Sequence, residues 1–310
     1  MTKRVFIDGA AGTTGLEVWD RLAVRPDIEL LEVDQDRRKD TQARRACLNE
    51  ADLVVLCLPD AAAREAVELI SNPAVKVIDA STAHRTAPGW VYGFPEMTPD
   101  HHKIVAESNR VSNPGCYPTG FIALVRPLVS CGLLPAETRM SVHAVSGYSG
   151  GGRPLIETFE SGLGEPFSLY GLGLQHKHLP EMQMHGLLAH PPLFCPSIAD
   201  YRQGMLVSVP LHMAWLRDGA SATDLQDALE AHFFGQACIT VHPLNDQSAF
   251  QRDAFLRPDG LNGTNHLEIF VFANQAQGQI LLVARLDNLG KGASGQSVQC
   301  LELMLGLGKN

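Results

Sequence analysis

A glycine-rich turn near the amino terminus constrains the fold of this chain more than any other feature. The stretch GAAGTTG (residues 9–15) directly follows an apolar run, Val5–Asp8, and precedes a helical pattern over Leu16–Ala23. Glycines between a strand and a helix let the backbone approach a pyrophosphate closely, and the first turn of the helix offers it unpaired N–H groups. The order predicts a dinucleotide site, with a tight turn that binds nothing as the alternative. Its residues would be Gly9, Gly12, Thr13, Thr14 and Gly15.

The residues after the second expected strand bear on the choice of dinucleotide. Asp34 falls where a carboxylate would bind the ribose hydroxyls of NAD. Arg37 and Arg38 follow at once and would suit the 2′-phosphate of NADP, because guanidinium groups bind phosphate in a bidentate manner. Either arginine would also be explained as a solvated loop charge. We predict NADP, with NAD left open.

The first third of the chain alternates short apolar runs with helical patterns. This rhythm is typical of a parallel, doubly wound sheet with helices on both faces. The expected helices are Leu16–Ala23 and Ala61–Ser71. The expected strands are Val5–Asp8, Ile28–Val33, Leu53–Leu58, Val75–Asp79 and Ile104–Ala106.

The rhythm changes after Cys116. A helix is expected around 121–128, then longer strands with few helices between them, which predicts a mixed or antiparallel sheet faced by helices. Ser221 and Asp224 have the spacing of a capping box that opens another helix. Ala293–Leu307 reads as a closing helix. The expected strands of this part are Arg139–Val145, Met205–His212, Ile239–His242, Leu267–Phe272 and Ile280–Leu286.

Charge and cysteine content exclude several classes of protein. The net charge of −9 argues against a nucleic-acid or anionic membrane surface, since those partners require a basic face. No apolar run approaches the roughly 20 residues of a membrane helix, and glycines follow the amino terminus too soon for a signal peptide. The seven cysteines include no C-x-x-C pair, which suits free thiols in a reducing cytoplasm.

One cysteine stands in a setting that favours chemistry. Cys116 lies between a Pro-Gly turn and an apolar helical run, in the stretch SNPGCYPTG (112–120). The helix dipole and the free N–H groups of its first turn would lower the pKa of the thiol and stabilise a thiolate. By contrast, Cys57 and Cys300 lie in apolar segments and read as packing residues. Cys116 is therefore the candidate nucleophile.

A nucleophilic cysteine needs an acid–base partner, and histidine is the usual one. Of the twelve histidines, His176 and His178 stand in a dense polar segment, HKHLPE (176–181). In an extended segment their side chains would share one face. A metal site is the competing interpretation, but no third ligand stands at a recognisable spacing, and we predict no metal.

A second loop has functional character. The stretch SGYSGGGR (146–153) contains three consecutive glycines, which lose more conformational freedom on folding than other residues. Backbone amides there would hold an oxyanion or carboxylate, with Arg153 as a bidentate clamp. A flexible surface loop is the alternative.

Together these features narrow the chemistry. A thiolate attacks an acyl phosphate or an aldehyde to give a thioester or thiohemiacetal, a nicotinamide transfers hydride, and histidine moves the proton.

The cysteine stretch also resembles the active-site signature of the N-acetyl-γ-glutamyl-phosphate reductases, relatives of the aspartate-semialdehyde dehydrogenases. The resemblance extends over nearly the whole chain and is closest to the compact subgroup of the family. The matching motifs, in chain order, are GAAGTTG, CLPD (57–60), VIDASTAHR (77–85), VYGFPE (91–96), SNPGCYPTG, SGYSGGGR, HKHLPE and DNLGKGASGQSVQ (287–299).

The resemblance implies the NADPH-dependent reduction of N-acetyl-γ-glutamyl phosphate to N-acetylglutamate semialdehyde, with release of phosphate, in arginine biosynthesis. Cys116 would form the thioester. His176 or His178 would be the acid–base catalyst, and the other would bind substrate beside Glu181. Asn288 would lie near the nicotinamide. Further implied substrate contacts are Arg85, Arg110, Asn113, Ser146, Gly147, Arg153 and Tyr170.

The resemblance also implies two domains. Residues 1–117, completed by the C-terminal helix within 289–310, would form a Rossmann-like dinucleotide-binding domain. Residues 118–288 would form the catalytic and oligomerisation domain, giving an α/β plus α+β chain. Exposed strands in the second domain favour a sheet-mediated homodimer or homotetramer.

Two other functions compete with this interpretation. Reduction of an aspartyl or aminoadipyl phosphate would use the same cysteine chemistry, because specificity lies in how the amino-acid end is held. A non-catalytic nucleotide-binding regulator would share the fold, but it would not need both Cys116 and the histidine segment.

Overall fold

The computed structural model describes residues 2–37 and 40–307 of the chain. It divides into two compact units. The first unit comprises Met1–Pro95, Asp100–Pro114 and Ala293–Asn310, and the second comprises Glu96–Pro99 and Gly115–Gly292.

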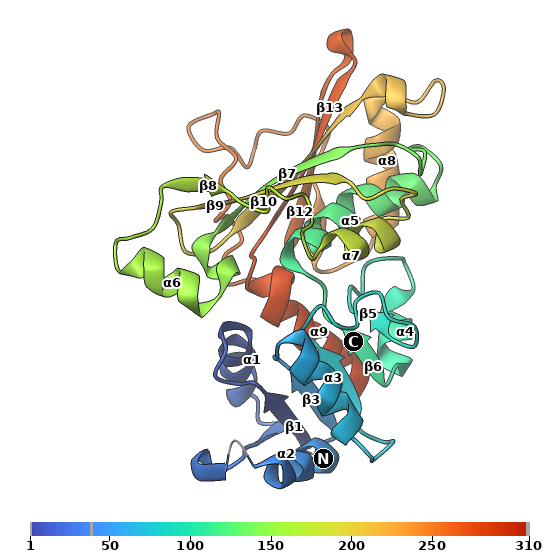
Figure 1. Cartoon of the computed structure of the whole chain (residues 1–310). Helices are drawn as coiled ribbons and strands as arrows, with labels where there is room; N and C mark the ends of the chain where they lie inside the picture. The colour runs from blue at the N-terminus through green and yellow to red at the C-terminus, as the bar shows by residue number, and fades with distance from the viewer. Residues whose placement is uncertain (1, 38–39, 308–310) are drawn as a thin grey trace. The chain divides into compact units, whose positions relative to one another are not determined.

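A six-stranded sheet, parallel throughout, forms the centre of the first unit (Figure 1). Its middle strand Leu53–Leu56 is apolar and fully buried, as expected of a strand covered on both faces. The strand order is β2 (Ile28–Leu31), β1 (Lys3–Asp8), β3 (Leu53–Leu56), β4 (Lys76–Asp79), β6 (Arg110–Ser112) and β5 (Val91–Tyr92). The predicted parallel, Rossmann-like sheet is confirmed.

Helices cover both faces of this sheet and bury two apolar clusters. On one face, Val18, Val105 and Leu301 pack together from α1 (Thr13–Ala23), α4 (His101–Glu107) and α9 (Gly295–Leu305). On the other, Leu48 and Ala63 pack from α2 (Thr41–Glu50) and α3 (Asp60–Leu69). The closing helix predicted from Ala293 therefore packs on the sheet of the first unit.

One local expectation in this unit is corrected, and one helix was not expected. The predicted strand Ile104–Ala106 is wrong, because these residues lie in α4, where Val105 faces the core. Three apolar or β-branched residues are too few to separate a strand from one turn of helix. Helix α2 has no strong apolar period, since Leu48 is its only buried residue, and the sequence pattern did not predict it.

A seven-stranded mixed sheet forms the second unit. Four of its strand pairs are antiparallel and two are parallel. The strand order is β11 (Ile239–Val241), β12 (Leu267–Asn274), β13 (Gln279–Leu286), β10 (Met205–His212), β7 (Ser141–Gly147), β9 (Leu193–Ala199) and β8 (Phe167–Leu169). The predicted mixed sheet is confirmed, although β8 and β9 were not expected. Pro196 interrupts the strand pattern of β9 and lowers its apparent strand propensity.

One face of this sheet is covered by α5 (Cys116–Ser130), α7 (Leu179–His185) and α8 (Ala222–Phe233), while α6 (Arg153–Glu160) lies beside the sheet (Figure 1). The predicted capping box at Ser221 and Asp224 opens α8. Gly120 of α5 lies directly against Val207 and Ala284, which point to the covered face. Their strand neighbours point the opposite way, because side chains alternate along a strand.

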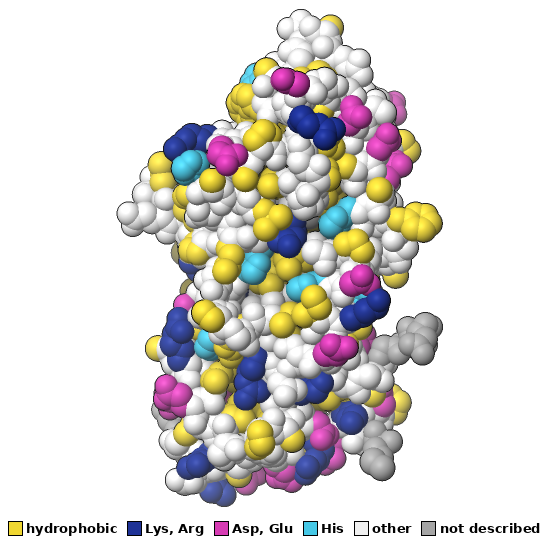
Figure 2. Space-filling model, turned by 90° about the vertical axis from the view of Figure 1, so that its right-hand side faces the viewer, with side chains coloured by type: hydrophobic (Ala, Val, Ile, Leu, Met, Phe, Trp, Pro, Cys, Tyr) yellow, Lys and Arg dark blue, Asp and Glu magenta, His cyan; other side chains and the backbone are white. Residues whose placement is uncertain are grey.

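Within the described residues, every helix is too short or too polar to cross a membrane. Basic and acidic side chains are interspersed on the face that Figure 2 shows.

Candidate active site

The candidate nucleophile begins a helix. Cys116 is the first residue of α5, and Gly115 precedes it in an extended conformation without a side-chain cap. The hydroxyl of Thr119 donates to the Gly115 carbonyl at 2.9 Å. The first N–H groups of a helix have no partner within the helix, and their dipoles stabilise negative charge. The fold therefore places the Cys116 thiol where a thiolate is favoured.

Glu181 joins the cysteine turn to the histidine segment. Its buried carboxylate accepts a hydrogen bond from the backbone N–H of Gly115, at 3.1 Å from Oε2. Its Oε1 lies 4.0 Å from Nε2 of His178, which is also buried and stands at the amino end of α7. A carboxylate beside an imidazole orients the ring and stabilises its protonated form. The predicted substrate contact Glu181 is thus hydrogen-bonded to the turn that carries the nucleophile.

His176 is held as a neutral imidazole. Burial, with the nearby charge of Lys177, lowers its pKa to about 4. Its Nδ1 accepts the backbone N–H of His178 at 3.2 Å, which assigns the ring proton to Nε2. At neutral pH this ring is therefore a hydrogen-bond donor at Nε2.

The two histidines meet for a different reason from the one predicted. The assumption of an extended segment is wrong, because residues 177–178 form a turn and His178 has helical backbone angles. The turn still brings the rings together, with centroids 4.6 Å apart. The aromatic ring of Phe194, which sequence analysis did not identify, lies 5.1 Å from that of His176.

Two tyrosines complete the cluster. The ring of Tyr117 is 6.4 Å from that of His176, and its hydroxyl donates to the Ser197 carbonyl at 3.0 Å. Tyr170, predicted from the sequence, is 5.7 Å from His176. Burial raises the pKa of both hydroxyls, and negative charge on Cys116 raises them further. Tyr117 was missed, although it directly follows the nucleophile in sequence.

The glycine-rich loop 146–153 packs closely against the backbone of Arg202 and Gln203. A side chain at Gly147 would lie 2.6 Å from the backbone of Arg202 and Gln203, so the glycine allows two backbones to pack. Ser146 is buried and its hydroxyl donates to the Gly147 carbonyl at 3.0 Å. Arg153 is exposed and pairs with Glu157 at 2.9 Å along α6.

Asn288 fastens this loop to the end of β13. Its side-chain amide donates to the Ser149 hydroxyl at 2.9 Å, and its carbonyl oxygen accepts the N–H of Gly204 at 2.8 Å. The predicted cofactor contact therefore has both ends of its amide engaged within the second unit.

The turn that follows approaches the nucleophile. A Cβ at Gly292 would lie 2.7 Å from Cβ of Cys116. The preceding Lys291 is fully buried and bonds both carboxylate oxygens of Glu96 at 2.8 Å. Both residues lie in motifs of the family resemblance, but their pairing was not predicted. The motifs lie almost 200 residues apart, and no short-range pattern connects them.

In the first unit, the predicted dinucleotide loop is a tight turn whose glycines allow close backbone packing. Gly9 has φ +89°, and a side chain there would lie 2.3 Å from the Cys57 carbonyl oxygen. Gly15 packs directly against the loop, since an added Cβ there would lie 2.4 Å from the Gly9 carbonyl oxygen. Thr13 and Thr14 form the first turn of α1, and Gly12 caps it with no side-chain hydrogen bond. Exposed N–H groups at such a helix end suit a phosphate.

The arginine candidates of the first unit have different surroundings. Arg37 is exposed and bonds Asp40 at 2.8 Å, while Arg38 lies outside the described residues. Arg85 is buried at the carboxyl ends of β4 and β6 and donates to the backbone carbonyls of Asn113 and Ala80.

Arg110 stands at the start of β6 and donates to the Val75 carbonyl at 2.8 Å. That is the amino end of the parallel strands, whereas ligands of such sheets bind at the carboxyl ends. This position does not suit the predicted substrate contact of Arg110. The side-chain amide of Asn113 donates to the Ala293 carbonyl at 3.0 Å.

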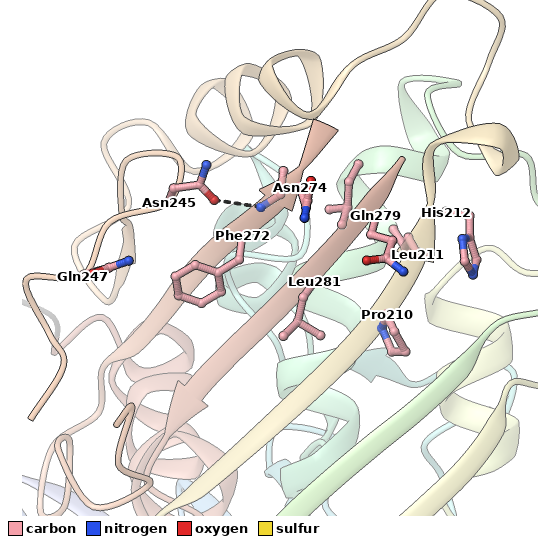
Figure 3. Close-up of a pocket in the computed structure, with 11 residues that line it drawn as sticks. Pro210, Leu211, His212, Asn245, Gln247, Phe272, Asn274, Gln279 and Leu281 are labelled. Atoms are coloured by element: carbon pink, nitrogen blue, oxygen red, sulfur yellow. Dashed lines mark hydrogen bonds between the residues drawn. The ribbon is translucent and has the colours of Figure 1, made fainter. Parts of the chain in front are cut away.

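A pocket of about 510 Å³ lies elsewhere on the second unit (Figure 3). Its walls come from β10, β12, β13 and the segment around Asn245, and they include Pro210, Phe272 and Leu281. None of the predicted site residues lines it. Within the described residues, no cluster of three or more His, Cys, Asp or Glu side chains is arranged to hold a metal ion.

Comparisons with known proteins agree over the whole chain. Residues 4–105 match the semialdehyde dehydrogenase NAD binding domain, and residues 116–288 match the semialdehyde dehydrogenase dimerisation domain. N-acetyl-gamma-glutamyl-phosphate reductase 2 of Nostoc sp. is 49% identical over 312 residues, covering 98% of this chain and 97% of its own length. N-acetyl-gamma-glutamyl-phosphate reductase of Burkholderia cenocepacia is 52% identical, covering 97% of both chains. The crystal structure of aspartate semialdehyde dehydrogenase II from Vibrio cholerae shares the fold, with a TM-score of 0.71, 17% identity and 99% coverage of both chains.

Proposed function

The chain belongs to the N-acetyl-γ-glutamyl-phosphate reductases, enzymes of arginine biosynthesis in the semialdehyde dehydrogenase family, and we propose that Cys116 is the nucleophile of this reaction. The observation that carries the proposal is the position of Cys116. It begins a buried helix, and Glu181 fastens the turn before it to the histidine segment. The reaction reduces N-acetyl-γ-glutamyl phosphate to the semialdehyde and releases phosphate.

The thiolate attacks the γ-carbonyl carbon, the bond between that carbon and the phosphate oxygen breaks, and phosphate leaves. The product of this step is a thioester on Cys116. The free N–H groups at the start of α5 stabilise the thiolate before the attack. They stabilise it again after reduction, when the bond between carbon and sulfur breaks and the semialdehyde leaves.

Nicotinamide dinucleotide, when bound, supplies the hydride that reduces the thioester carbon. The loop Gly9–Gly15 fits its pyrophosphate, because the glycines bring the backbone close and the first turn of α1 presents exposed N–H groups.

The two histidines have different roles in the proposed reaction. His176 donates from Nε2 to the oxygen that becomes negative when the carbonyl carbon turns tetrahedral, since its buried ring is neutral and carries the proton there. His178 accepts the proton of the Cys116 thiol, with the Glu181 carboxylate facing the imidazolium, and this proton leaves with the released phosphate. The Tyr170 phenol remains protonated beside them and serves as a further donor, while the Tyr117 hydroxyl donates to the Ser197 carbonyl.

Substrate contacts complete the proposal. Arg85 at the carboxyl edge of the first sheet and Arg153 on α6 would hold the phosphate and carboxylate, together with the backbone around Ser146 and Gly147. Residues 1–117 with 289–310 would bind the dinucleotide, while 118–288 would bind the substrate and carry the contacts between subunits.

Oligomerisation would use the uncovered face of the second sheet. That face exposes part of Pro210, Phe272 and Leu281, which also line the pocket of Figure 3. The dimerisation-domain match covers all of these residues. We propose a second copy of this chain as the partner, in a dimer or tetramer.

The first test runs the reaction in reverse, which avoids the labile acyl phosphate. Protein, N-acetylglutamate semialdehyde, phosphate and NADP are mixed, and the absorbance of the reduced nicotinamide is followed. Cys116→Ser should retain NADPH binding and lose at least about 1,000-fold in turnover. The matched control is Cys131→Ser, which alters an exposed cysteine outside the site. Turnover of Cys116→Ser close to the unaltered protein would disprove the covalent mechanism.

A second test concerns the preference for NADP. We propose that Arg37 and Arg38 bind the 2′-phosphate, as guanidinium groups after the second strand are suited to do. Arg37→Ala and Arg38→Ala should each lower kcat/KM with NADPH about 10-fold and leave the value with NADH unchanged. An unchanged ratio of the two values in both variants would assign the 2′-phosphate to other residues.

A further inference from the structure

A fully buried ion pair lies in the second unit. Lys291 is 0% exposed and Glu96 is 2% exposed. The ammonium nitrogen of Lys291 is 2.8 Å from each oxygen of the Glu96 carboxylate. Full removal of both charges from water is uncommon, since lysine and glutamate are almost never completely buried.

Stability does not account for this pair. Transfer of two charges into the interior has a desolvation cost that their attraction only partly offsets, and apolar residues of similar volume often stabilise as well or better. A buried ion pair does restrict geometry, because any displacement of one charge leaves the other unpaired. The pair is therefore suited to fixing the position of its neighbours.

The neighbour of Lys291 is the residue that touches the nucleophile. Gly292 packs so closely on Cys116 that an added Cβ would lie 2.7 Å from the cysteine Cβ and 3.2 Å from its Cα. The backbone N–H of Gly292 donates to the Asp287 carbonyl at 2.9 Å. Residues Gly290–Ser294 form a single π-helical turn, a rare geometry that is frequent at functional sites.

Both ends of the pair are themselves held in place. On the lysine side, the buried carboxylate of Asp287 accepts the N–H groups of Leu289 and Gly263, which fixes the turn. On the glutamate side, Gln236, just beyond α8, donates to the Pro99 carbonyl at 3.5 Å. The segment Glu96–Pro99 belongs to the second unit although the residues flanking it belong to the first.

We infer that the Glu96–Lys291 ion pair is a positioning device for the nucleophile. It holds the backbone of Gly292 against Cys116 and so sets the location of the thiol at the first turn of α5. Neither side chain need touch the substrate. The inference rests on the proposed function of Cys116 and adds a structural support for it.

The test replaces the pair by apolar residues of similar size, Glu96→Leu together with Lys291→Met. The double variant leaves no buried charge unpaired, so we expect a thermal unfolding midpoint close to that of the unaltered protein. We expect kcat to fall about 10- to 100-fold with less than about a threefold change in KM, because a displaced reacting group affects the chemical step.

A second readout needs neither substrate nor dinucleotide. Iodoacetamide alkylates thiolates, and mass spectrometry of the peptide that contains Cys116 measures its rate alone. In the double variant the alkylation rate should fall about 10-fold at pH 7, because the thiol is displaced relative to the N–H groups of the first turn of α5. The midpoint of the pH dependence of this rate should move to higher pH. The single variant Glu96→Gln keeps the volume of the pair and should show the same direction of change.

The control is a second ion pair, the half-buried Arg25 with Glu302 in the first unit, where Arg25 also pairs with Asp27. Arg25→Met together with Glu302→Leu should leave kcat and Cys116 alkylation unchanged. Wild-type kcat and alkylation in a folded Glu96→Leu, Lys291→Met protein would overturn the inference. Should that protein fail to fold, wild-type values in Glu96→Gln would overturn it instead. Full turnover in Cys116→Ser would refute the proposed function itself, which is a separate outcome.

Discussion

The close contact between Gly292 and Cys116 predicts a large effect from one methyl group. In Gly292→Ala the new Cβ would lie 2.7 Å from the Cys116 Cβ. The optimal separation of two carbon atoms is about 3.5 to 4.0 Å, so the atoms must move apart by about 0.8 to 1.3 Å. Because the contacting atoms include the Cα of Cys116, at 3.2 Å, rotation of the thiol cannot relieve the clash.

The displacement should cost activity more than stability. Overpacking by one carbon destabilises a protein by about 1 to 3 kcal/mol, whereas a shift of about 1 Å at a reacting atom lowers the rate about 100-fold. We therefore expect Gly292→Ala to fold, to bind NADPH, and to lose about 100-fold in kcat. Steady-state kinetics in the reverse direction and iodoacetamide labelling of Cys116 would measure the two effects.

The control is Gly173→Ala, because an added Cβ at Gly173 meets no heavy atom within 4 Å. That variant should match the unaltered protein in both assays. A Gly292→Ala protein with normal kcat and normal labelling would refute the reasoning, since it would show that the turn yields without moving the nucleophile.

Two further predictions concern pH and capping. The pKa of His176 is about 4 in the folded protein and near 6.5 when unfolded, so its contribution to stability is complete above pH 6.5 and is lost as the pH falls towards 4. Between pH 7 and 4.5, His176→Gln should therefore lose less free energy of unfolding than the unaltered protein, and equal losses in urea titrations would contradict the burial of this ring. Ser221→Ala removes the hydroxyl that accepts the Asp224 N–H at 3.3 Å, and it should lower the free energy of unfolding by about 1 kcal/mol at unchanged kcat. A change below about 0.3 kcal/mol would mean that the cap of α8 does not limit stability.

Local signals predicted most of the fold. The glycine turn, the apolar run Leu53–Leu56 and the long strands Met205–His212 and Gln279–Leu286 carry their periodicity within a few residues. The errors came where the signal was short or interrupted. One turn of α4 was predicted as a strand, and β9 was missed because a proline interrupts its strand pattern.

The candidate site was predictable in its chemistry and only partly in its geometry. A cysteine after a Pro-Gly turn at the start of a helix identifies Cys116, because the stabilising N–H groups come from the same short segment. The histidine segment was identified by its density of polar residues and by the need of a nucleophilic cysteine for an acid–base partner. Its turn, which brings the two rings together, does not follow from alternation along the chain.

What the sequence by itself determined, then, is the set of reactive groups and the elements that carry them, because helix starts, glycine turns and apolar periods are encoded over a few neighbouring residues. What only the tertiary structure decided is which distant groups meet. Glu181 reaches Gly115 across 66 residues, and Lys291 reaches Glu96 across 195. Such pairs depend on the packing of whole elements around a shared core, and that packing has no counterpart in the local order of residues.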